Sequence, residues 1–183
     1  MKMELDILPE CYVDTNVVAT MLSLEVPSAG MPVHCMGCNK VCGSMYSGKL
    51  SDSFALGIID KDKMEHSYVQ EFDVIGAKEH IELLKHKSRH HFIIRINPAM
   101  DKFILDMADR QGVRMGDYGL PDKLKEFTKL TKDANAKDNA NMKRLFKKLK
   151  DDEEMKTLRL VLAYLYNNKY SYDLDYLKKL VNP

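Results

Sequence analysis

Two short apolar runs constrain the fold more than any other feature of the sequence. Residues 54–60 are Phe-Ala-Leu-Gly-Ile-Ile-Asp, and residues 91–96 are His-Phe-Ile-Ile-Arg-Ile. The first is apolar almost without a break, as in strands that other elements cover on both faces, and the second is rich in β-branched side chains. Helix-like segments alternate with these runs. The pattern predicts an α/β fold with a mostly parallel sheet and flanking helices.

The periodicity of the sequence divides the chain into two parts. In the first part strands are expected at 10–13, 32–36, 54–60, 81–84 and 91–96, with helices at 16–24, 39–50 and 98–108. From Leu120 onward the pattern is helical, with helices expected at 123–130, 139–150, 153–166 and 172–181. The polar stretch 131–141 is the expected mobile linker. We therefore predict an α/β domain, residues 1–120, and a helical C-terminal region, residues 121–183, packed on it.

The charge and hydropathy of the chain limit its partners. Its 28 Lys and Arg residues nearly balance its 27 Asp and Glu residues, so no global field attracts polyanions. No apolar run approaches the roughly 20 residues that cross a bilayer, and the first six residues lack the apolar segment of a signal peptide. We expect a cytoplasmic protein with no membrane partner. A homo-oligomer is compatible with the sequence, but nothing in the sequence indicates one.

Three acidic residues follow expected strands. Asp14 comes after the first and Asp60 after the third, and Asp62 is on the same side of an extended chain as Asp60. Ligands of open α/β sheets bind beyond the carboxyl ends of the strands, so the three acids are expected to converge. Carboxylates that lie close together favour a cation, and Mg²⁺ takes oxygen ligands and activates water near a phosphate. The alternative is a capped turn neutralised by Lys61 and Lys63.

This order of strands, helices and acids resembles Toprim and Toprim-like domains, which are metal-dependent folds of topoisomerases, primases and defence nucleases. In that family a Glu-Gly pair after the first strand supplies a catalytic acid, and an Asp-x-Asp motif binds Mg²⁺. Residues 13–16 (Val-Asp-Thr-Asn) take the place of the first motif, and residues 57–62 (Gly-Ile-Ile-Asp-Lys-Asp) match the second. The resemblance covers about residues 8–110. In this alignment aspartate replaces glutamate, and the glycine is absent.

The resemblance implies catalytic and metal-binding roles for Asp14, Asp60 and Asp62. Asp101, within residues 98–103, resembles a further acid of some Toprim-like proteins and is a fourth candidate metal ligand. The implied function is Mg²⁺-dependent cleavage of a phosphodiester or other processing of nucleic acid, with a nuclease as the natural form. The competing hypothesis is a non-catalytic module of the same fold that binds a protein or nucleic-acid partner. The missing Glu-Gly pair favours that second hypothesis.

A second resemblance concerns residues 12–16, Tyr-Val-Asp-Thr-Asn. They are similar to the opening of PIN-domain ribonucleases, whose first strand ends in Asp-Thr-Asn. That family adds a glutamate on a later helix, but Glu25 is too close in sequence to Asp14. Asp60 also ends a strand where a helix start is needed. One motif of several fits, so this reading ranks second.

The cysteines suggest a metal site only superficially. Cys35, Cys38 and Cys42 have ligand-like spacing, yet a structural zinc site commonly uses two separated pairs, and no second Cys-x₂-Cys exists. Zinc is therefore not expected at these three residues, and a strand-to-helix turn with reduced thiols is the preferred interpretation. A redox-active pair is the alternative, although no thioredoxin-like pattern surrounds it.

The most basic short segment is residues 85–91, Lys-His-Lys-Ser-Arg-His-His. If the acids act on nucleic acid, Lys85, Lys87 and Arg89 are candidates for contacts with its phosphates. A solvated turn between two strands is the alternative. Neither this segment nor the basic helix at 143–150 has interleaved aromatic residues for base stacking.

Overall fold

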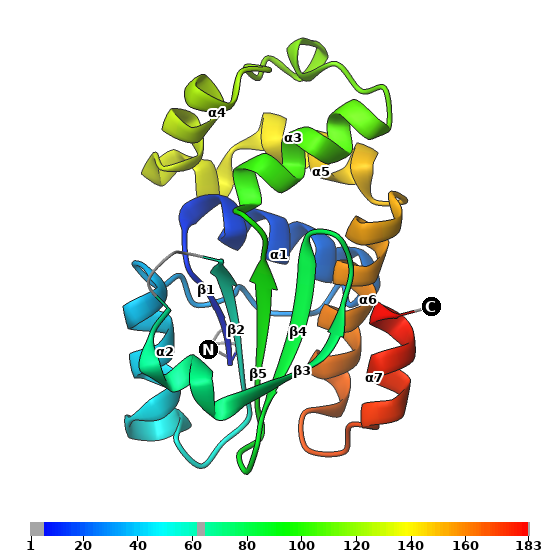
Figure 1. Ribbon diagram of the computed structural model, residues 1–183. Coiled ribbons are helices and arrows are strands. Elements are labelled where there is room, and N and C mark those ends of the chain that lie inside the picture. Colours follow the sequence, from blue (N-terminus) through cyan, green and yellow to red (C-terminus); the bar gives the residue numbers. More distant parts are fainter. Residues whose placement is uncertain (1–5, 62–64, 183) are drawn as a thin grey trace.

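A computed structural model describes residues 6–61 and 65–182 of the chain. Its sheet has the strand order β1-β2-β5-β4-β3 (Figure 1), formed by β1 (Ile7–Pro9), β2 (Ala55–Asp60), β3 (Phe72–Ala77), β4 (Ile81–His86) and β5 (His91–Ile96). Strands β1, β2 and β5 are parallel, whereas β4 is antiparallel to both β5 and β3. The α/β class is confirmed, but the sheet is mixed and not mostly parallel.

The mixed character follows from the length of two connections. Residues 78–80 join β3 to β4, and residues 87–90 join β4 to β5. A parallel crossover needs about a dozen residues or more, so these connections permit only antiparallel hairpins. Strand β3 was not expected from the sequence. It lies at the edge of the sheet, and with Asp73 and Val74 exposed it lacks a continuous apolar pattern.

The first strand ends earlier than predicted. Residues 10–13 were expected to be a strand, but β1 ends at Pro9 and α1 (Tyr12–Glu25) begins three residues later. The Asp14 carboxylate accepts a hydrogen bond from the Cys11 N–H at 3.1 Å, which stabilises the start of the helix. The expected strand at 32–36 is an extended segment beside β1, where the Val33 N–H donates to the Ile7 carbonyl. Only residue 32 of that segment forms a bridge.

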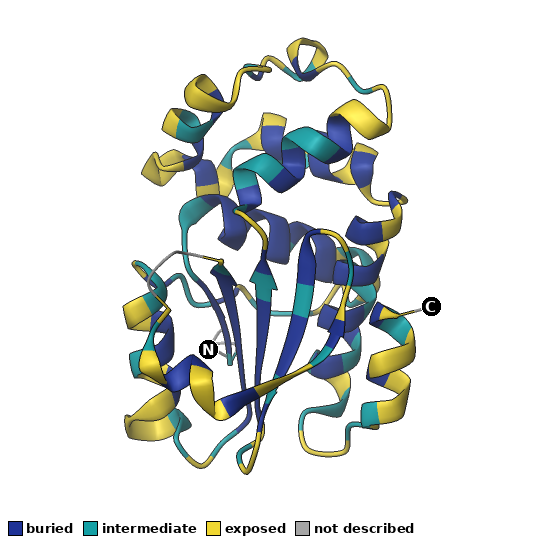
Figure 2. Ribbon diagram, in the orientation of Figure 1, coloured by how far each residue is buried: buried dark blue, intermediate teal, exposed yellow. Residues whose placement is uncertain are grey.

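Helices cover both faces of the sheet. α2 (Cys38–Tyr46) and the 3₁₀ helix η2 (Ser67–Glu71) pack on one face, and α1, α3 (Met100–Arg110) and α6 (Glu153–Asn168) pack on the other. Alternate residues of β2 supply the two clusters: Leu56 and Ile58 face α1, and Ala55 and Ile59 face α2. Figure 2 shows β2 and β5 buried along their lengths.

The remaining helices lie close to their predicted positions. They are α4 (Leu124–Thr131), α5 (Ala140–Leu149) and α7 (Leu174–Val181), with short 3₁₀ turns η1 (Gly48–Leu50), η3 (Met115–Tyr118) and η4 (Ala134–Asp138). The mobile linker expected at 131–141 is wrong, because η4 packs against α1. Ala136 of η4 is buried, and its carbonyl accepts a hydrogen bond from Asn16 Nδ2 at 2.7 Å. Among the described residues, no helix is both long and apolar enough to cross a membrane.

Candidate metal site at the carboxyl ends of the parallel strands

Three acidic side chains meet where the parallel strands end. Glu10 follows β1, Asp60 ends β2, and Asp101 lies in the first turn of α3, directly after β5. They line a cleft of about 350 Å³ that Thr128 and Lys132, from α4 and its end, close on the other side. The position is the one at which open α/β sheets bind ligands.

Asp14 is a fourth carboxylate near this cleft, although it does not line the cleft itself. Its side chain is fully buried in the first turn of α1. Oδ2 accepts the Cys11 backbone N–H, whereas Oδ1 has no hydrogen-bond partner among the described residues. A buried carboxylate oxygen without a donor is costly, because desolvation is not offset by a hydrogen bond or a cation. Asp14 Oδ1 is thus a buried carboxylate oxygen that no hydrogen bond compensates among the described residues.

Hydrogen bonds from several elements hold the other acids in place. Asp60 Oδ1 accepts the Met100 N–H at 3.0 Å, which ties the end of β2 to the start of α3. The Asp60 N–H donates to Glu10 Oε2 at 2.9 Å, so Glu10 reaches across from β1 to β2. Asp101 accepts a hydrogen bond from the Thr128 hydroxyl, which connects α3 to α4.

Burial and mutual repulsion shift the pKa values of two of these acids strongly. Burial raises the pKa of Asp14 to about 7, and the nearby Glu10 and Asp101 carboxylates also raise it. Burial raises the pKa of Asp60 to about 8, with further contributions from Asp14 and Glu10. Near neutral pH the metal-free pair therefore holds protons that a divalent cation would displace.

The adjacent thiol does not add a nucleophile to this site. Burial first, and then the charge of Asp14, raise the pKa of Cys11 well above its usual range. Cys11 is therefore a neutral thiol at physiological pH, and thiolate chemistry is not available from it. The anionic groups that line the cleft are carboxylates, and carboxylate oxygens suit a hard cation such as Mg²⁺.

The structure places three of the four acids predicted from the sequence near one another, but among the described residues their ligand atoms do not all lie within 4.8 Å of one another. The charges of Asp14 and Asp101 contribute, after burial, to the raised pKa of Asp60. The fourth, Asp62, lies outside the described residues. Glu10 was missed, because it was assigned to the first position of the expected strand 10–13, whereas it follows Pro9, the last residue of β1. Had Pro9 been recognised as the strand end, the spacing Glu10-x₃-Asp14 would have indicated both acids.

The predicted phosphate-binding residues lie at the opposite end of the sheet. β2 and β5 run in register from Ala55 beside His91 to Asp60 beside Ile96, and residues 87–90 precede β5. Lys85 Nζ donates to two backbone carbonyls of this hairpin. Arg89 Nη1 donates to the Tyr46 carbonyl at 3.1 Å. These two side chains hold the hairpin, and with the exposed Lys87 they lie away from the acidic cleft.

Two of the three clustered cysteines lie close together. The Cys38 and Cys42 sulfurs are 3.9 Å apart, one turn along α2. Cys35 Sγ contacts the Val33 carbonyl instead, at 3.7 Å. The geometry therefore pairs the two helical thiols and separates the third from them.

No protein-family model, curated protein or solved structure matches this chain. The Toprim-like and PIN-like resemblances stay predictions of the sequence, and the candidate site stands on its own geometry.

Proposed function

We propose that the chain binds Mg²⁺ at Glu10, Asp14, Asp60 and Asp101 and uses it to cleave a phosphodiester or otherwise process nucleic acid. One observation carries the proposal: Asp14 Oδ1 is buried without a hydrogen-bond partner among the described residues, near a second, half-buried carboxylate, Asp60. A divalent cation would satisfy that oxygen and remove the repulsion between the two acids.

The lining of the cleft supports a phosphate substrate. Lys61 is paired with Glu82 at 3.1 Å, but Lys132 has no ion-pair partner among the described residues. Lys132 is thus available to bind a phosphoryl oxygen opposite the acids. When bound, the ion would supply activation of water and stabilisation of charge on the phosphoryl group. The carboxylates would hold the ion, and Lys132 would orient the substrate.

The position of Glu10 adds support through the resemblance to Toprim-like domains. That family has glutamate and glycine directly after its first strand, and here Glu10 and Cys11 follow β1. In this alternative alignment Glu10, and not Asp14, would take the place of the family's glutamate, and Cys11 would take the place of its glycine. The predicted Asp-x-Asp motif consists of Asp60 and Asp62, and the role of Asp62 stays a prediction of the sequence.

The test is cleavage of single- and double-stranded DNA and RNA with Mg²⁺ or Mn²⁺. Asp60→Asn and Glu10→Gln are expected to lose at least about 100-fold of the metal-dependent rate, since each removes a charge that holds the ion. Asp73→Asn, on an exposed residue of β3, is the control and should cleave like the wild type. Equal cleavage by Asp60→Asn would remove this site from the reaction. Binding of metal with no cleavage of any substrate would favour the non-catalytic module instead.

A further inference from the structure

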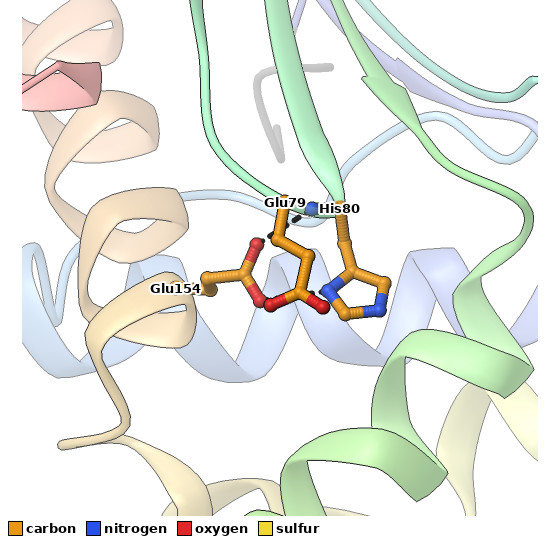
Figure 3. Close-up of side chains that lie close together, drawn as sticks. All are labelled: Glu79, His80 and Glu154. Atoms are coloured by element: carbon orange, nitrogen blue, oxygen red, sulfur yellow. Dashed lines mark hydrogen bonds and ion pairs between the residues drawn. The ribbon is translucent and has the colours of Figure 1, made fainter.

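A second cluster of ligand-type side chains lies at the turn between β3 and β4. Figure 3 shows Glu79 and His80 of this turn and Glu154 of α6 with their polar atoms directed toward one another. His80 Nδ1 lies 2.8 Å from Glu154 Oε2, and one ligand atom from each of the three residues lies within 4.8 Å of the others. We propose that this cluster is a transition-metal site, best matched to Zn²⁺ and separate from the acidic cleft.

The imidazole of His80 is oriented as in many metal sites. Its Nε2 lies 3.1 Å from Asp106 Oδ2 and its Nδ1 lies 2.8 Å from Glu154 Oε2, so each ring nitrogen faces a carboxylate, and an ion bound at Nδ1 would take the place of the contact with Glu154. Metal-binding histidines characteristically donate their second nitrogen to a carboxylate in this way. Asp106 is itself paired with Lys102, which leaves it as a supporting group and not a ligand.

Glu154 is positioned with equal specificity. Its Oε1 accepts the backbone N–H of His80 at 2.8 Å, which leaves Oε2 directed at the imidazole. Glu154 is buried, as is His80, whereas Glu79 is exposed and closes the cluster from the solvent side. Two ligands are therefore held rigidly, and the third can adjust to an ion.

Ion pairs offset the buried carboxylate of the cluster but, among the described residues, not the exposed one. Arg110 forms two hydrogen bonds with Asp152, both at 2.9 Å, so these two charges offset each other. One guanidinium nitrogen also reaches Glu154 Oε2 at 3.1 Å. Glu79 has no ion-pair partner among the residues that the structure describes. Glu154 is thus already in contact with Arg110 and His80, and the negative charge of Glu79 is the one in the cluster that a bound cation would offset.

The mixed donor set distinguishes this cluster from the acidic cleft. One imidazole nitrogen and two carboxylates suit Zn²⁺, whereas Mg²⁺ is commonly held by oxygen ligands alone. Beside the cluster lies an open cleft of about 480 Å³, lined by both glutamates, Arg110 and Gln111. It leaves space for water as the fourth ligand of a tetrahedral ion.

Titration of the metal-free chain with Zn²⁺ and Co²⁺ tests the proposal by calorimetry and by the visible spectrum of tetrahedral Co²⁺. The wild type is expected to bind one equivalent at this site. Glu79→Gln changes an exposed side chain, so the protein should stay folded while its Zn²⁺ affinity falls at least about tenfold. His80→Gln should abolish binding, and Asp106→Asn should weaken it.

Two controls make the result decisive. Glu153→Gln changes an exposed neighbour in the same cleft and should bind Zn²⁺ like the wild type. Asp60→Asn should also bind Zn²⁺ normally, because the acidic cleft is a different site. The proposal is overturned if the wild type binds no Zn²⁺ or Co²⁺, or if Glu79→Gln and His80→Gln both retain wild-type affinity. Loss of Zn²⁺ binding in Asp60→Asn alone would assign the ion to the acidic cleft.

Discussion

At the scale of single residues, the buried carboxylate of Asp14 lowers the stability of the metal-free protein, whereas the proposed metal site needs its charge. Its carboxylate helps to begin α1, yet its second oxygen is buried without a donor among the described residues. An apolar or amide side chain would be easier to bury. A cation bound to this carboxylate, as the proposed site requires, would offset the cost of burying it.

Asp14→Asn is therefore expected to stabilise the metal-free protein at pH 8. The pKa of Asp14 is raised from 3.8 to about 7, so its contribution to stability is complete below about pH 4 and is lost as the pH rises through 7. Wild-type stability should fall by about 2 kcal/mol between pH 5 and pH 8 from this residue. The variant should lack that fall, as measured by urea unfolding at both pH values.

In the same unfolding experiment with Mn²⁺ present, the wild type is expected to be more stable than Asp14→Asn. Bound metal should stabilise the wild type and have a much smaller effect on Asp14→Asn, because mass action stabilises only the form that binds. Asp73→Asn is the control and should follow the wild type throughout. Parallel pH profiles for wild type and Asp14→Asn would contradict the assignment of the raised pKa.

The residues of the site could be predicted only in part. Asp14 and Asp60 were predicted because acids after strands converge in α/β folds, and that rule needs only approximate element positions; Asp101 was predicted only through the resemblance to Toprim-like proteins. Glu10 was missed because the end of β1 depends on tertiary pairing with residues 33–37, which local periodicity does not contain. Lys132 was missed for a similar reason, since α4 comes to the cleft by helix packing.

At the scale of elements, α2 lies unusually close to the sheet at Gly57 of β2. A Cβ atom there would be 2.9 Å from Val41 Cγ1 and 3.0 Å from Met45 Sδ. Gly57→Ala is expected to lower the free energy of unfolding by about 1–3 kcal/mol, since α2 must shift away. Gly43 lies within α2 and has no atom within 4 Å of the position of a new Cβ. Because alanine is favoured over glycine inside a helix, Gly43→Ala should raise the free energy of unfolding by about 0.5–1 kcal/mol. Chemical denaturation measures both, and equal effects would contradict the close packing.

The contact of η4 with α1 gives a second test at this scale. Asn16 Nδ2 donates to the carbonyls of Ala136 and Asn139, at 2.7 and 3.2 Å. Asn16→Ala should cost about 1–3 kcal/mol, because buried carbonyls lose their donors, and should speed hydrogen exchange in residues 131–141. Asn135→Ala, exposed in the same segment, should leave exchange unchanged. Fast exchange there in the wild type would restore the linker prediction.

The direction of the strands was harder to predict than their existence. β2 and β5 were recognised from apolar and β-branched runs, and their limits agree with the structure within a residue. β3 lies at an edge, so few of its side chains are buried, and no apolar run indicates it. Because β3 was not expected, its antiparallel pairing with β4 was not expected either, and the sheet was predicted to be mostly parallel.

At the scale of the whole molecule, the helical region and the sheet share one core. The largest apolar cluster includes Leu56 and Ile94 from the sheet, Phe127 from α4 and Leu158 from α6. The helical region also supplies Thr128 and Lys132 to the acidic cleft. The candidate site therefore requires both parts of the chain.

The shared core predicts a single cooperative unfolding transition. Far-ultraviolet circular dichroism, which follows the helices, and tyrosine fluorescence should give the same urea midpoint. A chain that ends at residue 120 should fail to fold, since it would expose the face of the sheet that α6 covers. Two separate transitions, or a folded and metal-binding truncated chain, would show that the parts are independent domains.

The most direct test of the acidic site is anomalous diffraction from crystals soaked in Mn²⁺. We predict a peak in the cleft with carboxylate oxygens of Asp60 and at least one of Glu10, Asp14 and Asp101 at about 2.0–2.3 Å. The peak should disappear in Asp60→Asn. A cleft without a peak in the wild type, or a peak that Asp60→Asn leaves unchanged, would contradict the proposed metal site.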